Sequence, residues 1–348
     1  MKKFFVSLVM LLSLSAASVF AQSSLIATLS HEGEITPFYG ADALKEAHEA
    51  AVHGDAITLS SGTFIATDIT KAITLRGAGM QLDTINQILP TEISGDFTIN
   101  VADNVTDKLT IESIYHNHRI TVKGTLKEAR FIKNRLKELS CSSATDGALS
   151  NCNFIHCMIV GLFHVTGSGT DCIVSNSYIA QFGYLSNSTS AMSFSNSILN
   201  TDTKGYGGGI PLGDYYKCSF VNCVLIGNYS TIGRDDRLPS NATAYNCVAV
   251  NCYGTCFVNI PNTTNTSSTY AEVFKDFTGK YSDDITFELT DGAKTKFLGT
   301  DGTQIGIYGG NFPYTPISTN PRITKCNVAA KSTADGKLSV DIEVAGAE

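Results

Sequence analysis

The feature that most constrains this chain is an internal repeat in its central third. The phrase "NCNFIHCMIVG" (residues 151–161) returns in altered form as "DCIVSNSYIAQ" (171–181), "AMSFSNSILNT" (191–201), "KCSFVNCVLIG" (217–227) and "NCVAVNCYGTC" (246–256). Aligned on His156, Asn176, Asn196, Asn222 and Asn251, the phrases follow one another after 20, 20, 26 and 29 residues. Repeats of this length predict a solenoid, in which each unit buries its apolar face against its neighbours.

Each phrase predicts two short strands joined by a bend. On either side of the Asn-like residue, apolar or small residues recur every second position, which is the period of one strand face. Between the two pairs the spacing is three, so a single bend residue must turn the chain, and Asn tolerates the left-handed backbone of such a bend. The predicted inward columns are Cys152, Cys172, Met192, Cys218 and Cys247; Phe154, Val174, Phe194, Phe220 and Ala249; Cys157, Ser177, Ser197, Cys223 and Cys252; and Ile159, Ile179, Leu199, Leu225 and Gly254.

Stacking such coils places like residues about 4.8 Å apart in parallel sheets. Three further segments strengthen this interpretation: "ADALKEAHEAAVHGDAITLSSGTF" (41–64), "KAITLRGAG" (71–79) and "FELTDGAKTKFLGTDGTQIGIYGG" (287–310). With them, the chain resembles the pectin lyase-like right-handed parallel β-helix superfamily, and the last segment is similar to the closing segment of many secreted bacterial β-helix proteins. The resemblance implies an all-β, right-handed parallel β-helix. It implies no single activity, because this fold hosts many functions.

The ends of the solenoid need covers, because they are edge strands. Residues 41–52 predict a short helix whose small apolar face caps the first coil. Residues 321–348 predict a β-hairpin, with Leu338, Val340, Ile342 and Val344 alternating with polar residues and "ADG" (334–336) as the turn. We therefore expect the β-helix over 22–312 and a linker with the hairpin over 313–348.

The first residues predict export. Lys2 and Lys3 precede an apolar run from Phe4 to Leu14 and a small-residue site ending at Ala21, which is typical of a signal peptide over 1–21. The remainder has no apolar stretch long enough to span a membrane. We expect a periplasmic, cell-surface or extracellular protein. The net charge of −7 without a basic run argues against nucleic acid as a partner.

Cysteine and histidine offer two further candidate sites. Most of the ten cysteines fill the predicted columns, where Ser and Met also occur, so we interpret them as small buried residues. Stacking brings Cys152 beside Cys172 and Cys218 beside Cys247, within reach of a disulfide. "HNH" (116–118) predicts surface or turn histidines, since no third metal ligand is evident. We expect no metal site.

Two insertions carry the most informative polar residues. "NTDTKGYGGGIPLGDYY" (200–216) and "GNYSTIGRDDRLPSNATAY" (227–245) follow the same position in successive coils, so the two loops must leave the solenoid side by side. Clustered aromatic and polar residues on a rigid scaffold are typical of a glycan-binding cleft. The residues expected to bind ligand are Tyr206, Asp214, Tyr215, Tyr216 and Tyr229.

Three functions remain open. The preferred one is a non-catalytic exported protein that binds a glycan or a surface partner through these loops. A hydrolase of acidic polysaccharide would need two converging carboxylates, and a lyase would need a basic residue beside Ca²⁺. Catalytic candidates for these alternatives are Asp202, Asp235, Asp236, Arg234 and Arg237. No cofactor is expected, apart from Ca²⁺ under the lyase alternative. The third function is a structural or adhesin-like rod.

Overall fold

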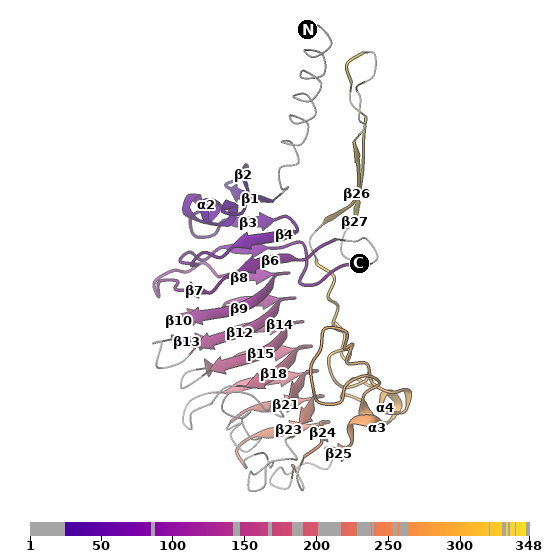
Figure 1. Ribbon diagram of the computed structural model, residues 1–348. Helices are drawn as coiled ribbons and strands as arrows, with labels where there is room; N and C mark the ends of the chain where they lie inside the picture. Colours follow the sequence, from indigo (N-terminus) through magenta and orange to yellow (C-terminus); the bar gives the residue numbers. More distant parts are fainter. Residues whose placement is uncertain are drawn as a thin grey trace, which may run out of the picture.

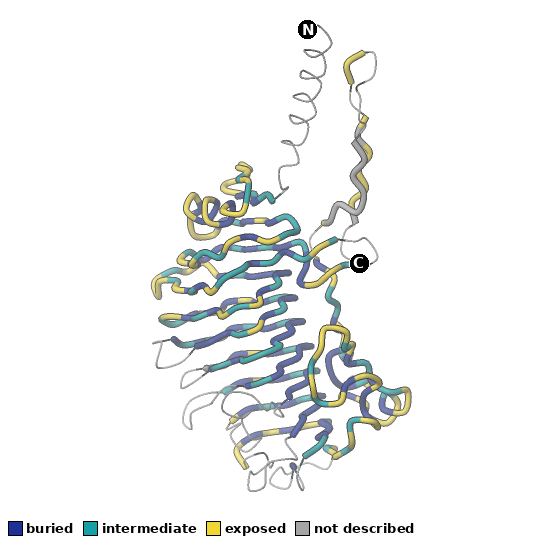
Figure 2. Tube along the Cα trace, in the orientation of Figure 1, coloured by how far each residue is buried: buried dark blue, intermediate teal, exposed yellow. Residues whose placement is uncertain are grey.

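The computed structural model describes residues 25–84, 88–141, 147–165, 169–182, 191–200, 217–227, 238, 240–252, 256–257, 264–319, 321–328, 332, 335–337 and 339–345. Within them the chain is a parallel β-helix, which confirms the predicted fold class (Figure 1). Buried residues follow the inside of the stacked strands (Figure 2).

Two long sheets form the walls of the helix. The first sheet contains, in spatial order, β2 (Glu34–Tyr39), β1 (Ile26–His31), β3 (Ala56–Leu59), β5 (Thr74–Arg76), β8 (Thr110–Glu112), β11 (Arg130–Ile132), β14 (Asn153–Ile155), β17 (Cys172–Ser175), β19 (Met192–Ser195), β21 (Ser219–Val221) and β23 (Thr243–Tyr245). The second sheet contains β4 (Gly62–Ile65), β6 (Thr91–Ser94), β9 (Tyr115–Val122), β12 (Arg135–Cys141), β15 (Met158–Val165), β18 (Tyr178–Phe182), β20 (Ile198–Asn200), β22 (Val224–Ile226), β24 (Val248–Val250) and β25 (Thr266–Ser268), with β7 (Phe97–Ile99) paired to β9. A short third sheet contains β10 (Gly124–Lys127), β13 (Gly147–Ser150) and β16 (Gly169–Thr170).

The strand register confirms the predicted aromatic column. Phe154 pairs with Val174, Val174 with Phe194, and Phe194 with Phe220. The rings of Phe194 and Phe220 stack with centroids 5.1 Å apart, and all four side chains are buried. Successive coils therefore place like residues over one another along the interior.

The register of the last predicted repeat is wrong by five residues. Phe220 pairs with Ala244 rather than Ala249, so Asn246, and not Asn251, occupies the bend that follows Asn222. Both asparagines have a left-handed backbone, with φ of 50° and 55°, so the conformational signal does not distinguish them. In the correct register the residues "VAV" form β24, and all three of them are buried. It also makes 243–245 strand β23 instead of part of the predicted loop 227–245.

A column of left-handed residues joins the first sheet to the second. We call it the bend ladder; its members, with φ between 44° and 59°, are Ser113, Lys133, His156, Asn176, Asn196, Asn222 and Asn246. At this bend, one left-handed residue in each coil turns the chain between two strands, as the spacing predicted.

The N-terminal end of the helix is covered by a helix and a hairpin. Helix α2 (Ala43–Ala50) confirms the predicted cap, and it buries Ala43, Leu44 and Ala47. Strand β1 pairs antiparallel with both β2 and β3. This hairpin, which the sequence reasoning did not foresee, ends the parallel sheet and protects its edge.

After β25 the described chain leaves the stacked coils and lies against the outside of the second sheet (Figure 1). Residues 269–296 contain the short helices α3 (Tyr270–Val273) and α4 (Asp291–Lys296). Between the two helices, Phe277 and Phe287 join an apolar cluster with Tyr178 and Val224 of the second sheet. Strands β20, β22 and β24 are consequently buried on both faces. Continuous apolar runs such as "VLI" and "VAV" are typical of strands that are buried on both faces.

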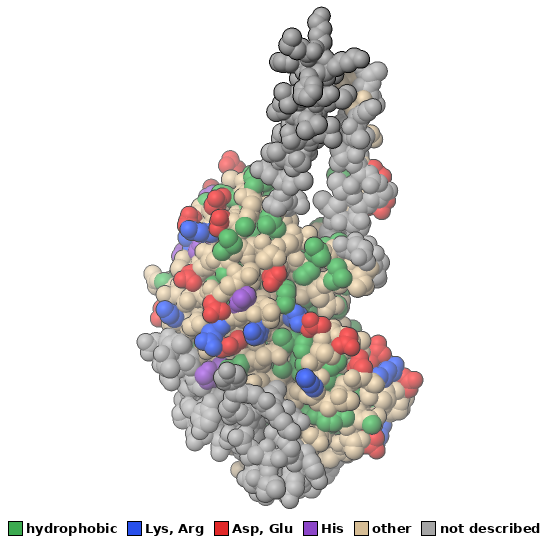
Figure 3. Space-filling model, in the orientation of Figure 1, with side chains coloured by type: hydrophobic (Ala, Val, Ile, Leu, Met, Phe, Trp, Pro, Cys, Tyr) green, Lys and Arg blue, Asp and Glu red, His purple; other side chains and the backbone are tan. Residues whose placement is uncertain are grey.

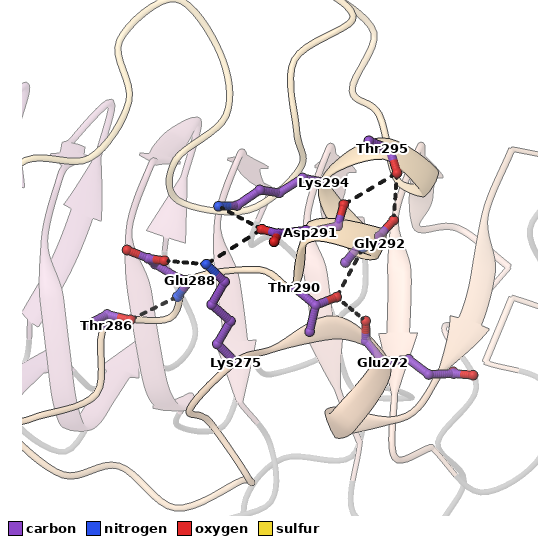
Figure 4. Close-up of polar contacts among 10 residues, drawn as sticks. Glu272, Lys275, Thr286, Glu288, Thr290, Asp291, Gly292, Lys294 and Thr295 are labelled. Carbon is purple, nitrogen blue, oxygen red and sulfur yellow. Dashed lines mark hydrogen bonds and ion pairs between the residues drawn. The ribbon is translucent and has the colours of Figure 1, made fainter.

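Polar contacts hold this outer layer together (Figure 4). Lys275 Nζ lies 3.1 Å from Glu288 and 3.6 Å from Asp291, and Asp291 also faces Lys294. The Thr290 side chain accepts from the Ala293 N–H at the start of α4 and donates to the Glu272 carbonyl. Because these ion pairs are exposed, each contributes little to stability.

The C-terminal prediction of a hairpin is also confirmed. Strands β26 (Arg322–Val328) and β27 (Val340–Ala345) pair antiparallel and project away from the coils (Figure 1). Ile342 and Val344 are 51% and 60% exposed. The hairpin is thus an extension of the molecule rather than part of its core.

Candidate functional site

The predicted loop site lies outside the described residues. Asp202, Tyr206, Asp214, Tyr215 and Tyr216, together with Tyr229, Arg234, Asp235, Asp236 and Arg237, all belong to segments that the structure does not describe. Asn200, the first residue of the first loop segment, is described and pairs in register with Ile226, which comes directly before the second.

A different site emerges where the chain runs back along the bend ladder. We call residues 297–319 the strap. The Thr300 N–H donates to Asn222 Oδ1 (3.0 Å), and Asn176 Nδ2 donates to the carbonyls of Ile307 (3.0 Å) and Gly309 (2.7 Å). Residue numbers rise along the strap as the ladder numbers fall, so the strap runs antiparallel to the direction in which the coils stack.

The same pattern continues toward the N-terminal coils. The His156 Nε2 atom lies 2.9 Å from the Phe312 carbonyl, and Lys133 Nζ donates to the Ile317 carbonyl at 2.8 Å. Thr319 Oγ1 donates to the Glu112 carboxylate, one residue before the ladder position Ser113. Four ladder residues therefore turn the chain with their backbone and also hold the strap with their side chains: Lys133, His156, Asn176 and Asn222.

The strap does not close completely onto the ladder. Between them lies an open groove of about 1170 Å³, which we call the strap groove. One wall is the bend ladder with its flanking strand residues, and the other is the strap. Its lining includes Lys133, His156, Ser175, Asn176, Asn196, Asn222, Thr300, Asp301, Asn311, Phe312, Tyr314, Thr315, Ser318 and Thr319.

The groove wall combines apolar side chains, among them Ile132, Ile155 and Ile317, with neutral groups that form hydrogen bonds. Burial lowers the pKa of His156, and the neighbouring Lys133 lowers it further, so the imidazole is neutral at neutral pH. Hydrogen bonds from Thr303 lower the pKa of Asp301, which is therefore ionised. Outside the groove, acidic and basic side chains are interspersed on the face shown in Figure 3, so no field of a single sign dominates that face.

Two aromatic residues of the strap contribute to the apolar part of the groove, together with Ile132, Ile155 and Ile317. Tyr314 is buried, with its ring centroid 6.1 Å from that of His156. Phe312 is 79% exposed, although it is a large apolar side chain. An exposed ring beside a polar groove is the arrangement in which a sugar face can stack.

The cysteines are structural in the described part of the chain. Nine of them stand as thiols, and eight of these are buried. Cys152 does lie beside Cys172, whose pKa is raised by the Cys152 side chain and by burial. The predicted pair Cys218–Cys247 is wrong because of the register error; Cys223 and Cys247 are the neighbours, and burial raises the pKa of Cys223. Burial raises the pKa of Cys157 to about 12, so this thiol is inert at neutral pH.

The prediction that both histidines of "HNH" lie at the surface is wrong for His116. This side chain is fully buried, its Nδ1 lies 2.8 Å from the Ile93 carbonyl, and its ring packs edge-on against Phe97. His118 is partly exposed and lies 3.9 Å from Asp96. Among the residues that the structure describes, no group of three or more His, Cys, Asp or Glu side chains is arranged to hold a metal ion.

Sequence reasoning missed the strap groove because it assigned residues 287–310 to the coils. Two signals point to it in retrospect. "VLI" and "VAV" in the second sheet are too apolar for strands with a solvated face. The pair Gly309–Gly310 allows close approach: a Cβ on Gly310, whose φ is +80°, would lie 2.6 Å from Asn196 Nδ2.

Comparison with known proteins gave no match: no family model, no curated protein and no solved structure is similar to the chain. No helix in the described part of the chain combines the length and the hydropathy needed to cross a bilayer.

Proposed function

We propose that this protein is an exported, non-catalytic β-helix that binds a glycan in the strap groove. The observation that carries the proposal is the composition of the groove: side-chain amides, hydroxyls and a neutral imidazole lie among its apolar side chains, and the exposed ring of Phe312 stands beside them. Sugars are recognised by this combination of hydrogen-bonding groups and an aromatic face.

The groove offers little support for catalysis. Glycoside hydrolysis needs two carboxyl groups on either side of the bond, and Asp301 is the one carboxylate among the described lining residues. Lys133, the lining residue that a lyase could use as a base, is buried and bonded to the Ile317 carbonyl. The lyase or hydrolase alternative, with Ca²⁺ for the lyase, therefore depends on Asp202, Arg234, Asp235, Asp236 and Arg237 of the undescribed loops.

The loops 200–216 and 227–245 remain part of the proposal as a second contact region for a long glycan or a surface partner. The pairing of Asn200 with Ile226 in adjacent strands supports this part of the proposal. Tyr206, Asp214, Tyr215, Tyr216 and Tyr229 would supply its aromatic and polar contacts.

We further propose membership of the pectin lyase-like superfamily and export through residues 1–21. The parallel β-helix with an N-terminal helix cap supports the first. The basic start, the apolar run and the small-residue site support the second.

The test compares Phe312→Ala with Tyr39→Ala, a control that removes an exposed aromatic ring (68% exposed) on the N-terminal cap. The His156 bond uses the Phe312 carbonyl, which the Phe312→Ala protein keeps. Residues 22–348 would be mixed with immobilised neutral and acidic polysaccharides, with and without Ca²⁺, while retention, reducing ends and unsaturated products are measured. We expect retention without cleavage, lost in Phe312→Ala and kept in Tyr39→Ala.

Product formation would overturn the non-catalytic assignment. Retention that is equal in the two variants would remove the strap groove as the binding site. Absence of retention on every polysaccharide would contradict glycan binding itself.

A further inference from the structure

Two smaller hollows follow the strap groove toward the N-terminal cap, in the direction in which the strap runs (Figure 1). The first, which we call the middle hollow, has a volume of about 190 Å³ and lies between residues 78–84, Ile88 and strap residues 316–318. The second, which we call the end hollow, has a volume of about 330 Å³ and lies between strands β1 and β3 and Pro321.

Neighbouring hollows share parts of their walls. Ile317 and Ser318 line both the strap groove and the middle hollow, and Ala78 and Ile88 line both the middle hollow and the end hollow. Ile317 is 44% exposed, so a surface side chain stands where the groove and the middle hollow meet. The three hollows therefore adjoin in one row, which we call the track.

The length of the track follows from the strand order of the first sheet. The strap groove extends from the level of β21 to that of β11, four strand spacings away (β21, β19, β17, β14, β11), and the end hollow reaches β1, a further four spacings away (β11, β8, β5, β3, β1). At about 4.8 Å per spacing, the groove is roughly 19 Å long and the whole track roughly 38 Å. A sugar unit in an extended chain is about as long as one spacing, so the groove matches about four sugars and the track about eight.

The two hollows offer the same kinds of chemical group as the strap groove. In the middle hollow, the amide of Gln81, the hydroxyl of Thr84 and the apolar side chain of Leu82 belong to exposed residues. In the end hollow, Thr58 is exposed and Ser61 is half-buried. Accessible hydrogen-bonding groups beside apolar side chains therefore continue along the whole track, as recognition of successive sugars requires.

We propose that the track binds a long linear polysaccharide lengthwise, with the sugar chain parallel to the axis of the solenoid. The strap groove holds about four sugars of this chain, and the middle and end hollows hold those that follow. This inference rests on the proposed function and narrows it from glycans in general to chains longer than about four sugars.

The experiment measures, by titration calorimetry, how tightly residues 22–348 bind the tetramers and hexamers obtained from cellulose, mannan, xylan and polygalacturonate. The hexamer is long enough to leave the strap groove, whereas the tetramer is not. Leu82→Ala removes an exposed apolar side chain (43% exposed) from the middle hollow. Its matched control is Leu89→Ala, because Leu89 is 60% exposed in the same segment and lines none of the three hollows. Phe312→Ala reports on the strap groove itself.

We expect the hexamer of the preferred sugar to bind at least about fivefold more tightly than its tetramer, since it gains contacts in the middle hollow. Leu82→Ala should weaken hexamer binding about three- to tenfold through the lost apolar contact, and Leu89→Ala should leave it unchanged. Neither leucine variant should change tetramer binding, which also shows that both proteins are folded.

Equal binding of tetramer and hexamer, with both dependent on Phe312, would overturn the track and leave the proposed function intact. A preference for the hexamer that Leu82→Ala does not reduce more than Leu89→Ala would overturn the track as well. Binding of no oligosaccharide, or binding unaffected by Phe312→Ala, would overturn both the track and the proposed function.

Discussion

At the scale of single residues, the bend ladder performs two tasks. Asn176 adopts a φ of 46°, which turns the coil, and its amide donates to two strap carbonyls. Asn meets both requirements because it tolerates the left-handed backbone and carries two donors. The sequence pattern reveals the first task only, since backbone sterics are local whereas the strap is 131 residues away in sequence.

Replacing Asn176 separates the two tasks. Asn176→Gly keeps the left-handed backbone and leaves two strap carbonyls without their donor, so we expect a loss of about 1–3 kcal/mol in the free energy of unfolding. Asn176→Ala should lose about 1–2 kcal/mol more, because a Cβ is strained there. Urea denaturation of both variants measures the difference. Equal losses in the two would contradict the role of the left-handed backbone.

His156 makes the stability of the folded protein depend on pH. Its pKa in the folded protein lies below its ordinary value near 6.5, through burial and the adjacent Lys133. Below pH 6.5 the unfolded state therefore binds more protons than the folded state. The contribution of His156 to the free energy of unfolding is present above that pH and is lost as the pH falls. Tyr314 of the strap also faces the ring and is uncharged in this range.

We therefore expect His156→Asn to lose stability less steeply than the parent chain between pH 7 and pH 5. The variant keeps a ladder residue that suits the bend and removes the titrating group. Chemical denaturation at several pH values gives the slope for each protein. His116→Asn is a positive control: it removes another histidine with a lowered pKa, outside the strap groove, and should reduce the slope as well. Identical slopes for His156→Asn and the parent would contradict the assignment.

At the scale of elements, the two-residue periodicity predicted the strands. It failed at the last repeat, where two asparagines both satisfy the rule for a bend residue. Asn246 and Asn251 are both left-handed, and the choice between them depends on which apolar triplet stacks on "VLI". The helix cap and the hairpin were predictable because both depend on local pattern. The strap groove was not, because it is created by packing a segment without regular periodicity against a sheet already complete in hydrogen bonds.

The approach of the strap depends on glycine where the chain meets Asn196. Gly310 and Gly302 both have φ near +80°, but a Cβ on Gly310 meets Asn196 whereas one on Gly302 meets nothing within 4 Å. Gly302→Ala should thus cost about 1–2 kcal/mol from backbone strain alone. Gly310→Ala should cost about 1–3 kcal/mol beyond that, because the strap must move.

Thermal unfolding and retention on the immobilised polysaccharides would be measured for both glycine variants. We expect weaker binding for Gly310→Ala alone, since only that substitution displaces a wall of the strap groove. If both variants lost the same stability and bound equally well, the close contact between the strap and the ladder would be disproved.

At the scale of the whole molecule, the described chain has two kinds of C-terminal segment. Residues 269–319 cover the outer face of the second sheet, where Phe277 and Phe287 pack with Tyr178 and Val224. The hairpin of β26 and β27 pairs with itself and leaves Ile342 and Val344 exposed. Residues 269–319 are therefore part of the core, whereas the hairpin is an extension attached to it.

This difference predicts opposite results for two truncations. A protein ending at residue 320 keeps the last strap contact, Thr319 to Glu112, and we expect its melting temperature and circular dichroism to match those of the full chain. A protein ending at Ser268 loses the cover of β20, β22 and β24, including several buried phenylalanines worth about 3–5 kcal/mol each. It should bind a hydrophobic dye and lose cooperative unfolding. Unfolding of the longer truncation would make the hairpin part of the folding unit, and cooperative melting of the shorter one would show that the β-helix is stable without its outer layer.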